Sequence, residues 1–239
     1  MRQKVHYKFL FFDLDHTLLD FDAAEEVALT KLLEEYQVTD IKAYKDYYKP
    51  MNQNLWKQLE HGDISKVDLI NSRFALLFAH FGVTVDGRQL AEAYQKHLKY
   101  QGQVYVGAKE LLEKLVAKGY NLYAATNGIA TIQQGRLEAS GLVPYFKAIF
   151  ISEQSGSQKP NKAFYDWMTQ QVPHYQPEQA LMIGDSLSAD IQGGINAGMD
   201  TLWYNPKHLL NNSPVHPTYE VSDYQALLTS IVGTTDNSL

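Results

Sequence analysis

Apolar residues follow three successive patterns along the chain. Phe9 to Phe12 form a continuous apolar run, too short for a membrane helix and about right for a buried strand. From Asp22 to Gln101, apolar residues recur three or four positions apart, which is the spacing of one helix face. From Gly107 onward, short apolar runs alternate with helical patterns. Strands that alternate with helices predict a parallel, doubly wound α/β sheet.

The helical stretch is too long to be a simple connection between two strands. A βαβ crossover usually needs one helix of about 10–15 residues. Here the predicted helices begin near Asp22, Ile41, Ser65 and Asp86, and Gly62 and Gly82 are predicted to end the second and third. We therefore predict an inserted α-helical cap domain over residues 22–101 and an α/β core made of residues 1–21 and 102–239. The alternative is an all-α domain unrelated to the core.

The rest of the chain predicts the remaining elements of the core. Further strands are predicted at Tyr120–Ala125, Ala148–Ile151, Ala180–Ile183 and Met199–Tyr204. Helices are predicted around Leu111–Val116, at Ile129–Ser140, from Pro160 to about Gln171, at Ser188–Ala197 and at Asp223–Val232. Loops are predicted at Ser152–Lys159 and Asn205–Thr218, and a polar tail from Gly233 to Leu239.

Composition narrows the class of protein. The 239 residues include 45% apolar side chains, enough for a sizeable core, and the net charge of −6 lacks the basic footprint of a nucleic-acid binder. The absence of cysteine excludes disulfides, thiol catalysis and cysteine-ligated zinc, and it suits a cytoplasmic protein. The first apolar run ends in acids, so we expect no signal peptide, and no apolar run reaches the ~20 residues of a membrane span.

Polar side chains follow each of the first four predicted core strands. Asp13 and Asp15 come after the first strand, and side chains two positions apart on a strand point the same way. The later strands are followed by Thr126-Asn127, by Lys159-Pro160, and by Gly184-Asp185 with Asp190. Singly, these are an ordinary turn, loop or helix cap. Because open α/β sheets bind ligands at the carboxyl ends of their strands, the set favours one shared site.

These motifs resemble the signatures of the haloacid dehalogenase superfamily. Asp-Leu-Asp-His-Thr-Leu after four apolar residues is similar to the first signature, and the resemblance extends from Tyr7 to about Asn205. It implies a Rossmann-like core and phosphoryl transfer through an aspartyl-phosphate. Superfamily dehalogenases generally lack the second acid, because halide needs no proton, so Asp15 favours a phosphatase.

The resemblance implies a role for each acid of the set. Asp13 would be the nucleophile, and Asp15 would protonate the leaving oxygen and later deprotonate the attacking water. Mg²⁺ would be bound by Asp13, the backbone carbonyl of Asp15 and Asp185, since it prefers carboxylates, phosphate oxygens and water.

The other polar residues are implied to bind and stabilise the phosphoryl group. Thr126 and Asn127 would donate hydrogen bonds to its oxygens, and Lys159 would balance the charge of the transition state. Asp190 would orient Lys159 or a metal-bound water.

Several segments resemble one branch more closely, the YjjG-type pyrimidine 5′-nucleotidases. They are Leu55-Trp56, Gly62-x-Ile64, Arg73-Phe74, Thr126-Asn127-Gly128, Arg136-Leu137-Glu138, Ile151-Ser152-Glu153, Lys159-Pro160-Asn161 and Gly193 to Gly198. This similarity implies a nucleoside monophosphate as substrate. In the cap, Trp56 could stack on the base and Arg73 could hydrogen-bond it, whereas the alternative makes Trp56 part of the cap core and Arg73 a surface ion pair.

Three other functions stay open at this point. A sugar-phosphate phosphatase would share the architecture, and a phosphomutase would return the phosphoryl group to a sugar instead of passing it to water. A catalytically silent binding module would turn over no phosphomonoester. The sequence makes no prediction of oligomeric state.

Overall fold

The strand β1 (Phe9–Phe12) lies inside a parallel six-stranded sheet with the order β3-β2-β1-β4-β5-β6. The other strands are β2 (Asn121–Thr126), β3 (Ala148–Ile151), β4 (Ala180–Gly184), β5 (Asp200–Tyr204) and β6 (Tyr219–Val221). The structure, a computed structural model, describes residues 6–233, so the predicted tail beyond Gly233 lies outside the described residues. The predicted doubly wound α/β sheet is confirmed.

The sixth strand, β6, is not among the strands predicted from the sequence. Tyr219–Val221 is only a three-residue strand, with one side chain exposed, one half-buried and one buried. A segment this short carries no periodic signal. It becomes a strand because it pairs with β5, where Leu202 lies opposite Tyr219.

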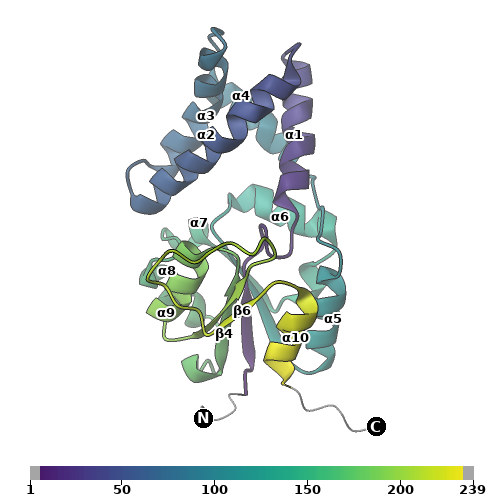
Figure 1. Cartoon of the computed structure of the whole chain (residues 1–239), viewed down its shortest axis with the longest axis vertical. Coiled ribbons are helices and arrows are strands. Elements are labelled where there is room, and N and C mark those ends of the chain that lie inside the picture. The colour runs from purple at the N-terminus through teal and green to yellow at the C-terminus, as the bar shows by residue number, and fades with distance from the viewer. Residues whose placement is uncertain (1–5, 234–239) are drawn as a thin grey trace. The chain divides into compact units, whose positions relative to one another are not determined.

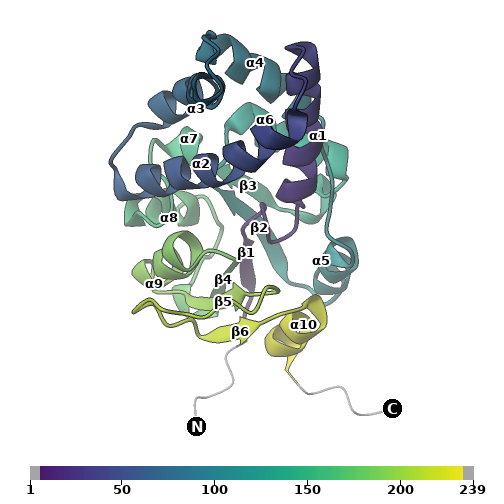
Figure 2. The same cartoon turned by 45° about the horizontal axis from the view of Figure 1, so that its top comes forward.

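Alternate side chains of β1 serve the two faces of the sheet, as a strand's geometry requires. Leu10 and Phe12 belong to one hydrophobic cluster, which also contains apolar residues of α5 (Ala108–Ala117) and α10 (Tyr224–Val232). Phe9 and Phe11 belong to a second cluster with α8 (Lys162–Thr169). Figure 2 shows α5 and α10 on one side of the strands and α8 and α9 on the other. Because β1 is buried on both faces, it has the continuous apolar run from which it was predicted.

The remaining helical segments of this α/β unit lie in the connections between strands. They are α6 (Ala130–Ser140), η1 (Val143–Tyr145), α7 (Ser152–Ser155), η2 (Pro177–Gln179), η3 (Leu187–Ile191) and α9 (Gln192–Asn196). The predicted loop at Ser152–Lys159 is thus wrong in its first half, where α7 forms.

The predicted single helix from Ser188 to Ala197 is instead two pieces, the π-helical η3 and the α-helical α9. Ser186 caps η3, and its hydroxyl accepts a hydrogen bond from the backbone N–H of Ala189. Single-turn π segments occur often at functional sites, and here the turn carries Asp190.

Residues Asp22–Gln101 form a second compact unit, and Met1–Phe21 with Gly102–Leu239 form the first. The second unit, purple to blue in Figure 1, contains α1 (Phe21–Glu35), α2 (Ile41–His61), α3 (Lys66–His80) and α4 (Gly87–Leu98). None of the described helices in residues 6–233 is long and apolar enough to cross a membrane.

The sequence signals located most of these helix ends. Ser65 and Asp86 cap α3 and α4 through their side chains, and Gly62 ends α2 in the left-handed conformation, as predicted. Asp22 is not a cap, because α1 already begins at Phe21. It lies in the first turn, where a negative charge favours the helix N-terminus.

A buried polar group lies within the helical unit. Arg73 is 3% exposed, and its guanidinium carbon lies 5.0 Å from the ring centres of both Phe74 and Tyr94. Asn52 donates a 3.3 Å hydrogen bond to Glu25. Burial raises the pKa of Glu25 to about 7, although the charge of Arg73 works in the opposite direction. The alternative in which Arg73 forms a surface ion pair is therefore wrong.

We expect Glu25 to make the stability of the protein depend on pH. A carboxyl group whose pKa is raised in the folded state stabilises the fold at low pH, and this contribution is lost as pH rises through about 7. Between pH 5 and pH 8, the free energy of unfolding of the wild type should fall by about 2–3 kcal/mol more than that of Glu25→Gln. Denaturant unfolding at both pH values measures the difference.

The neighbouring Glu26 supplies the matched control. Its pKa is lowered by hydrogen bonds from Lys45 and Lys49, so Glu26→Gln should not reproduce the effect of Glu25→Gln. Equal pH slopes for the wild type and Glu25→Gln would show that Glu25 stays ionised in the fold.

Candidate active site

The loops that carry the predicted polar residues meet at the carboxyl ends of neighbouring strands. Asp13 follows β1, Thr126 ends β2 and Asp185 follows β4, and both β2 and β4 pair with β1. From β1 the chain runs to β2 and β3 on one side, and the connection from β3 then crosses to β4 on the other side. The carboxyl ends of β1 and its two neighbours therefore form a topological switch point, where open α/β sheets bind ligands.

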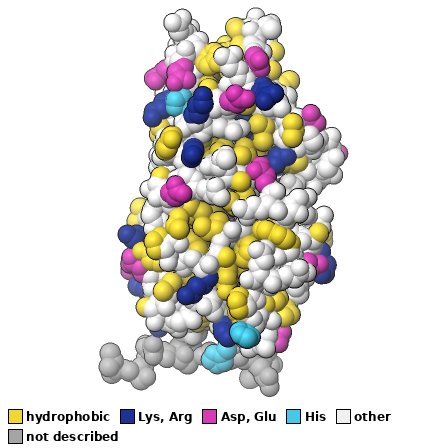
Figure 3. Space-filling view, turned by 180° about the vertical axis from the view of Figure 1, so that it is seen from behind, with side chains coloured by type: hydrophobic (Ala, Val, Ile, Leu, Met, Phe, Trp, Pro, Cys, Tyr) yellow, Lys and Arg dark blue, Asp and Glu magenta, His cyan; other side chains and the backbone are white. Residues whose placement is uncertain are grey.

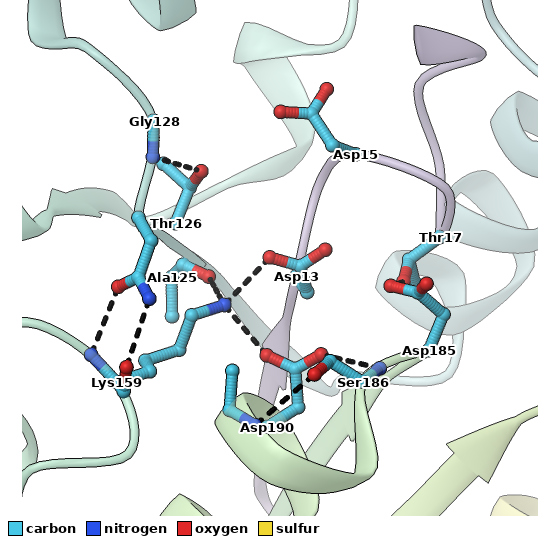
Figure 4. Close-up of polar contacts among 12 residues, drawn as sticks. Asp13, Asp15, Thr17, Ala125, Thr126, Gly128, Lys159, Asp185, Ser186 and Asp190 are labelled. Atoms are coloured by element: carbon cyan, nitrogen blue, oxygen red, sulfur yellow. Dashed lines mark hydrogen bonds and ion pairs between the residues drawn. The ribbon is translucent and has the colours of Figure 1, made fainter. Parts of the chain in front are cut away.

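The ammonium group of Lys159 is the centre of the site (Figure 4). Its Nζ donates hydrogen bonds to Asp13 Oδ1 at 2.6 Å, to Asp190 Oδ1 at 2.7 Å and to the carbonyl oxygen of Ala125 at 2.7 Å. Lys159 is 1% exposed. Three acceptors use all three donors of the ammonium group, so its position is fixed.

Burial and unbalanced charge shift the pKa values of these groups. Burial raises the pKa of Asp13 to about 7, with Lys159 opposing the shift and the negative charge of Asp190 adding to it. Burial, followed by the charges of Asp13 and Asp190, also raises the pKa of Asp185. Burial alone would lower the pKa of Lys159, but its two carboxylate partners outweigh burial and raise it. The site therefore contains more negative charge than its one lysine neutralises.

Asp190 is committed to the protein itself. One carboxylate oxygen accepts from Lys159, and the other accepts from the backbone N–H of Ser186 at 3.0 Å. Gly184 makes room for this side chain, because a Cβ there would lie 2.2 Å from Asp190 Oδ2. Asp190 thus holds Lys159 in place, and its role in catalysis stays a prediction.

Asp185 has weaker side-chain contacts. The Thr17 hydroxyl donates to Asp185 Oδ1 at 3.5 Å, and the indole N–H of Trp203 donates to the Asp185 backbone carbonyl at 2.8 Å. The backbone is therefore fixed, while the carboxylate keeps capacity to bind a cation.

The side chain of Asn127 shapes the loop that carries Lys159. It accepts a hydrogen bond from the backbone N–H of Lys159 and donates one to the backbone carbonyl, both at 2.9 Å. The Asn127 side chain is thus engaged with the Lys159 backbone, and hydrogen bonding from Asn127 to a phosphoryl group stays a prediction.

Thr126 accepts two hydrogen bonds through its hydroxyl oxygen. The donors are the backbone N–H of Gly128 at 3.1 Å and the side-chain amide of Gln133 at 2.9 Å. With its oxygen occupied as an acceptor, the hydroxyl can still donate its own proton to an anionic ligand.

Asp15 points away from the group formed by Lys159, Asp13 and Asp190 (Figure 4). Its two oxygens accept from Arg136 and from Gln133, the latter at 3.0 Å. Gln133 and Arg136 were not predicted as site residues. The signal that could have revealed them is two polar side chains, three positions apart, on the buried face of the helix that follows Thr126.

The acidic residues of the site suit a divalent cation. Asp13, Asp185 and Asp190 each offer an oxygen, and these oxygens lie within 4.8 Å of one another. The ligands are hard oxygen donors in a buried site with excess negative charge, which are the features that favour Mg²⁺ or Ca²⁺. Because both oxygens of Asp190 are engaged, Asp13 and Asp185 are the better candidates.

The two predicted substrate contacts of the cap lie in the helical unit. Trp56 is half-buried and packs against a small apolar cluster of Leu55, Leu59 and Leu69. Arg73 is buried between aromatic rings of the same unit. Contact between either residue and a substrate stays a prediction.

Two relatives of similar length to this chain are both named pyrimidine 5′-nucleotidases. The chain is 62% identical over 222 residues to the pyrimidine 5′-nucleotidase PynA of Streptococcus pneumoniae, covering 93% of this chain and 94% of that protein. It is 33% identical to the pyrimidine 5′-nucleotidase YjjG of Escherichia coli, covering 92% of this chain and 96% of that protein.

Solved structures agree with these relatives. The putative hydrolase YfnB of Bacillus subtilis, whose crystal structure bound to magnesium reveals interdomain movement, matches with a TM-score of 0.91 and 39% sequence identity. The match covers 95% of this chain and 99% of YfnB. Residues 10–204 also match the family model described as haloacid dehalogenase-like hydrolase, so the chain belongs to the haloacid dehalogenase-like hydrolases.

Proposed function

We propose that the protein is a Mg²⁺-dependent phosphomonoesterase that hydrolyses pyrimidine nucleoside 5′-monophosphates. The observation that carries the chemistry is the buried cluster of Lys159, Asp13 and Asp190 beside a second acid, Asp15. The substrate is proposed from the relatives, because the two named pyrimidine 5′-nucleotidases align over more than nine-tenths of the chain. The lack of cysteine supports a cytoplasmic location.

The first step is transfer of the phosphoryl group to the enzyme. A carboxylate oxygen of Asp13 attacks phosphorus, and the bond from phosphorus to the nucleoside 5′-oxygen breaks. Asp15 gives its proton to that oxygen as it leaves. The positive charge of Lys159 and the hydroxyl of Thr126 stabilise the negative phosphoryl oxygens in the transition state.

The second step restores Asp13. Water attacks phosphorus, Asp15 takes a proton from the water, and the bond between phosphorus and the Asp13 oxygen breaks. The products are inorganic phosphate and the free carboxylate. Because Asp15 gives a proton in one step and takes one in the next, each turnover leaves it as it began.

The residues that would hold Mg²⁺ are Asp13, Asp185 and the backbone carbonyl of Asp15. When bound, the cation neutralises the repulsion between the Asp13 carboxylate and the phosphate dianion. Lys159 alone does not balance the buried carboxylates, which supports a requirement for a further positive charge.

A small substrate agrees with the distribution of charge. On the face shown in Figure 3, basic side chains are scattered among acidic and apolar ones over the described part of the chain. A nucleic acid would require a basic stripe.

We predict that Asp13→Asn abolishes turnover while the fold is kept. An amide is a poor nucleophile, and enzymes accelerate phosphate monoester hydrolysis by as much as ~10²¹-fold. Phosphate release from dUMP should fall by at least roughly 10⁴-fold, the scale set by losing a triad nucleophile. Substantial release by pure Asp13→Asn would overturn the mechanism.

We predict that Asp185→Asn lowers the affinity for Mg²⁺ and stabilises the metal-free protein at pH 8. Burial, followed by the charges of Asp13 and Asp190, raises the pKa of Asp185, so its ionised form destabilises the metal-free fold. The stabilisation by Asp185→Asn should therefore be smaller at pH 5 than at pH 8. In a chain of this size, each kcal/mol gained raises the melting temperature by about 2–4 °C.

Calorimetry with and without Mg²⁺ measures both effects. Mg²⁺ should stabilise the wild type more than Asp185→Asn, and chelator should abolish wild-type turnover until Mg²⁺ is restored. Full turnover in excess chelator would contradict the metal assignment.

We predict that pyrimidine nucleoside monophosphates, with dUMP and dTMP tested first, are hydrolysed faster than hexose phosphates. If Trp56 stacks on the base, the stacking contributes roughly 1–3 kcal/mol. Trp56→Ala should then lower kcat/KM for nucleotides about ten- to a hundredfold and spare p-nitrophenyl phosphate. A panel measuring released phosphate tests this.

The same panel separates the alternatives. Much faster turnover of hexose phosphates than of every nucleotide would leave a general phosphatase, and isomer formation without phosphate release would indicate a mutase.

A further inference from the structure

We propose that Gln133 and Arg136 are positioning residues that orient the carboxyl group of Asp15 for protonation of the leaving oxygen. This inference rests on the proposed phosphatase function and assigns a task to two buried polar side chains of α6. Neither side chain lies in the group around Lys159.

The first observation is that the two side chains hold different oxygens of Asp15. Arg136 Nη1 donates to Asp15 Oδ1, and Gln133 Nε2 donates to Asp15 Oδ2 at 3.0 Å. A carboxyl group held at both oxygens cannot rotate about its Cβ–Cγ bond. Asp15 lies in the loop after β1, and these two contacts fix the direction of its carboxyl group.

The second observation is that Gln133 joins the acid to the phosphate-binding side of the site. Its amide nitrogen also donates to Thr126 Oγ1 at 2.9 Å, and its carbonyl oxygen accepts from Arg136 Nη1 at 3.1 Å. These partners fix the amide orientation, because the reversed amide would place its oxygen against the Asp15 carboxylate. Thr126, Gln133 and Asp15 are therefore positioned as one unit.

The third observation is that the fold holds both side chains rigidly. Arg136 is fully buried, and its guanidinium carbon lies 5.3 Å from the ring centre of Phe21. Gln133 is 1% exposed, and a Cβ at Gly128 would lie 2.4 Å from its Cγ. Glycine at this position thus makes room for Gln133. Packing of this kind supports the sub-ångström precision that proton transfer needs.

A purely structural role would predict a different outcome from a positioning role. If the pair only anchors α6 to the loop after β1, its loss should lower activity equally on all substrates. If it orients Asp15, the loss should depend on how strongly the leaving group needs a proton. A nucleoside alkoxide is a poor leaving group and needs the proton, whereas p-nitrophenolate leaves without one.

The experiment compares kcat/KM for dUMP and p-nitrophenyl phosphate in variants of the full-length, Mg²⁺-loaded protein. The value of kcat/KM depends only on the steps from substrate binding to departure of the leaving group. The later hydrolysis of the phospho-enzyme therefore does not affect it. In Gln133→Leu we expect the value for dUMP to fall about 100-fold, within the range for loss of general acid catalysis. The value for p-nitrophenyl phosphate should change less than about threefold, since its leaving group does not depend on that acid.

Two further variants provide controls. Gln134→Leu makes the same substitution at the adjacent exposed position and should leave both values unchanged. Arg136→Lys keeps the positive charge but loses the planar guanidinium group. The ratio of kcat/KM for dUMP to kcat/KM for p-nitrophenyl phosphate should therefore lie between the ratios of the wild type and Gln133→Leu. Melting temperatures identify any variant that fails to fold, and Gln133→Leu tests the inference by itself if Arg136→Lys does fail.

The outcomes separate the inference from the function on which it rests. Equal losses on both substrates, or no loss on either, overturn the positioning role while leaving the phosphatase intact. If the wild type favours another alkyl phosphate, that ester replaces dUMP in the comparison. A wild type that releases phosphate from no ester overturns both proposals.

Discussion

The buried ammonium group of Lys159 is the interaction on which the site depends. A lysine that is 1% exposed needs anionic or carbonyl partners, and here it has Asp13, Asp190 and the carbonyl of Ala125. Those partners come from the ends of β1 and β2 and from η3, so one cation connects three separate segments. Because all three of its donors are used, the proposed action of Lys159 on a phosphoryl group is mainly through its charge.

Other residues of the site can be understood as support for that cation. The Asn127 side chain hydrogen-bonds both backbone polar groups of Lys159, and Gly184 leaves space for the Asp190 side chain. The negative charge that remains around Asp13 and Asp185 supports the proposed binding of a divalent cation there.

Much of this arrangement could be predicted because it is local in the chain. The apolar run of β1, the caps Ser65 and Asp86, and the polar residues after each strand all leave a signal in a few neighbouring residues. The contact of Gln133 with Asp15 was not predicted, because Gln133 lies inside α6 and not at the end of a strand, where the sheet topology brings distant residues together. The strand β6 was missed for a related reason, since pairing with β5 and not its own pattern makes it a strand.

The hydroxyl of Thr126 gives the site a fixed polarity. Its oxygen is occupied by the N–H groups of Gly128 and Gln133, so toward a ligand it presents only hydrogen. A tetrahedral oxyanion matches that arrangement, because every atom at its surface accepts. An isostere that turns an N–H toward Thr126, such as a phosphoramidate or a sulfonamide, would set donor against donor. If Thr126 binds phosphate as proposed, the site selects ligands by the direction of their hydrogen bonds as well as by their charge.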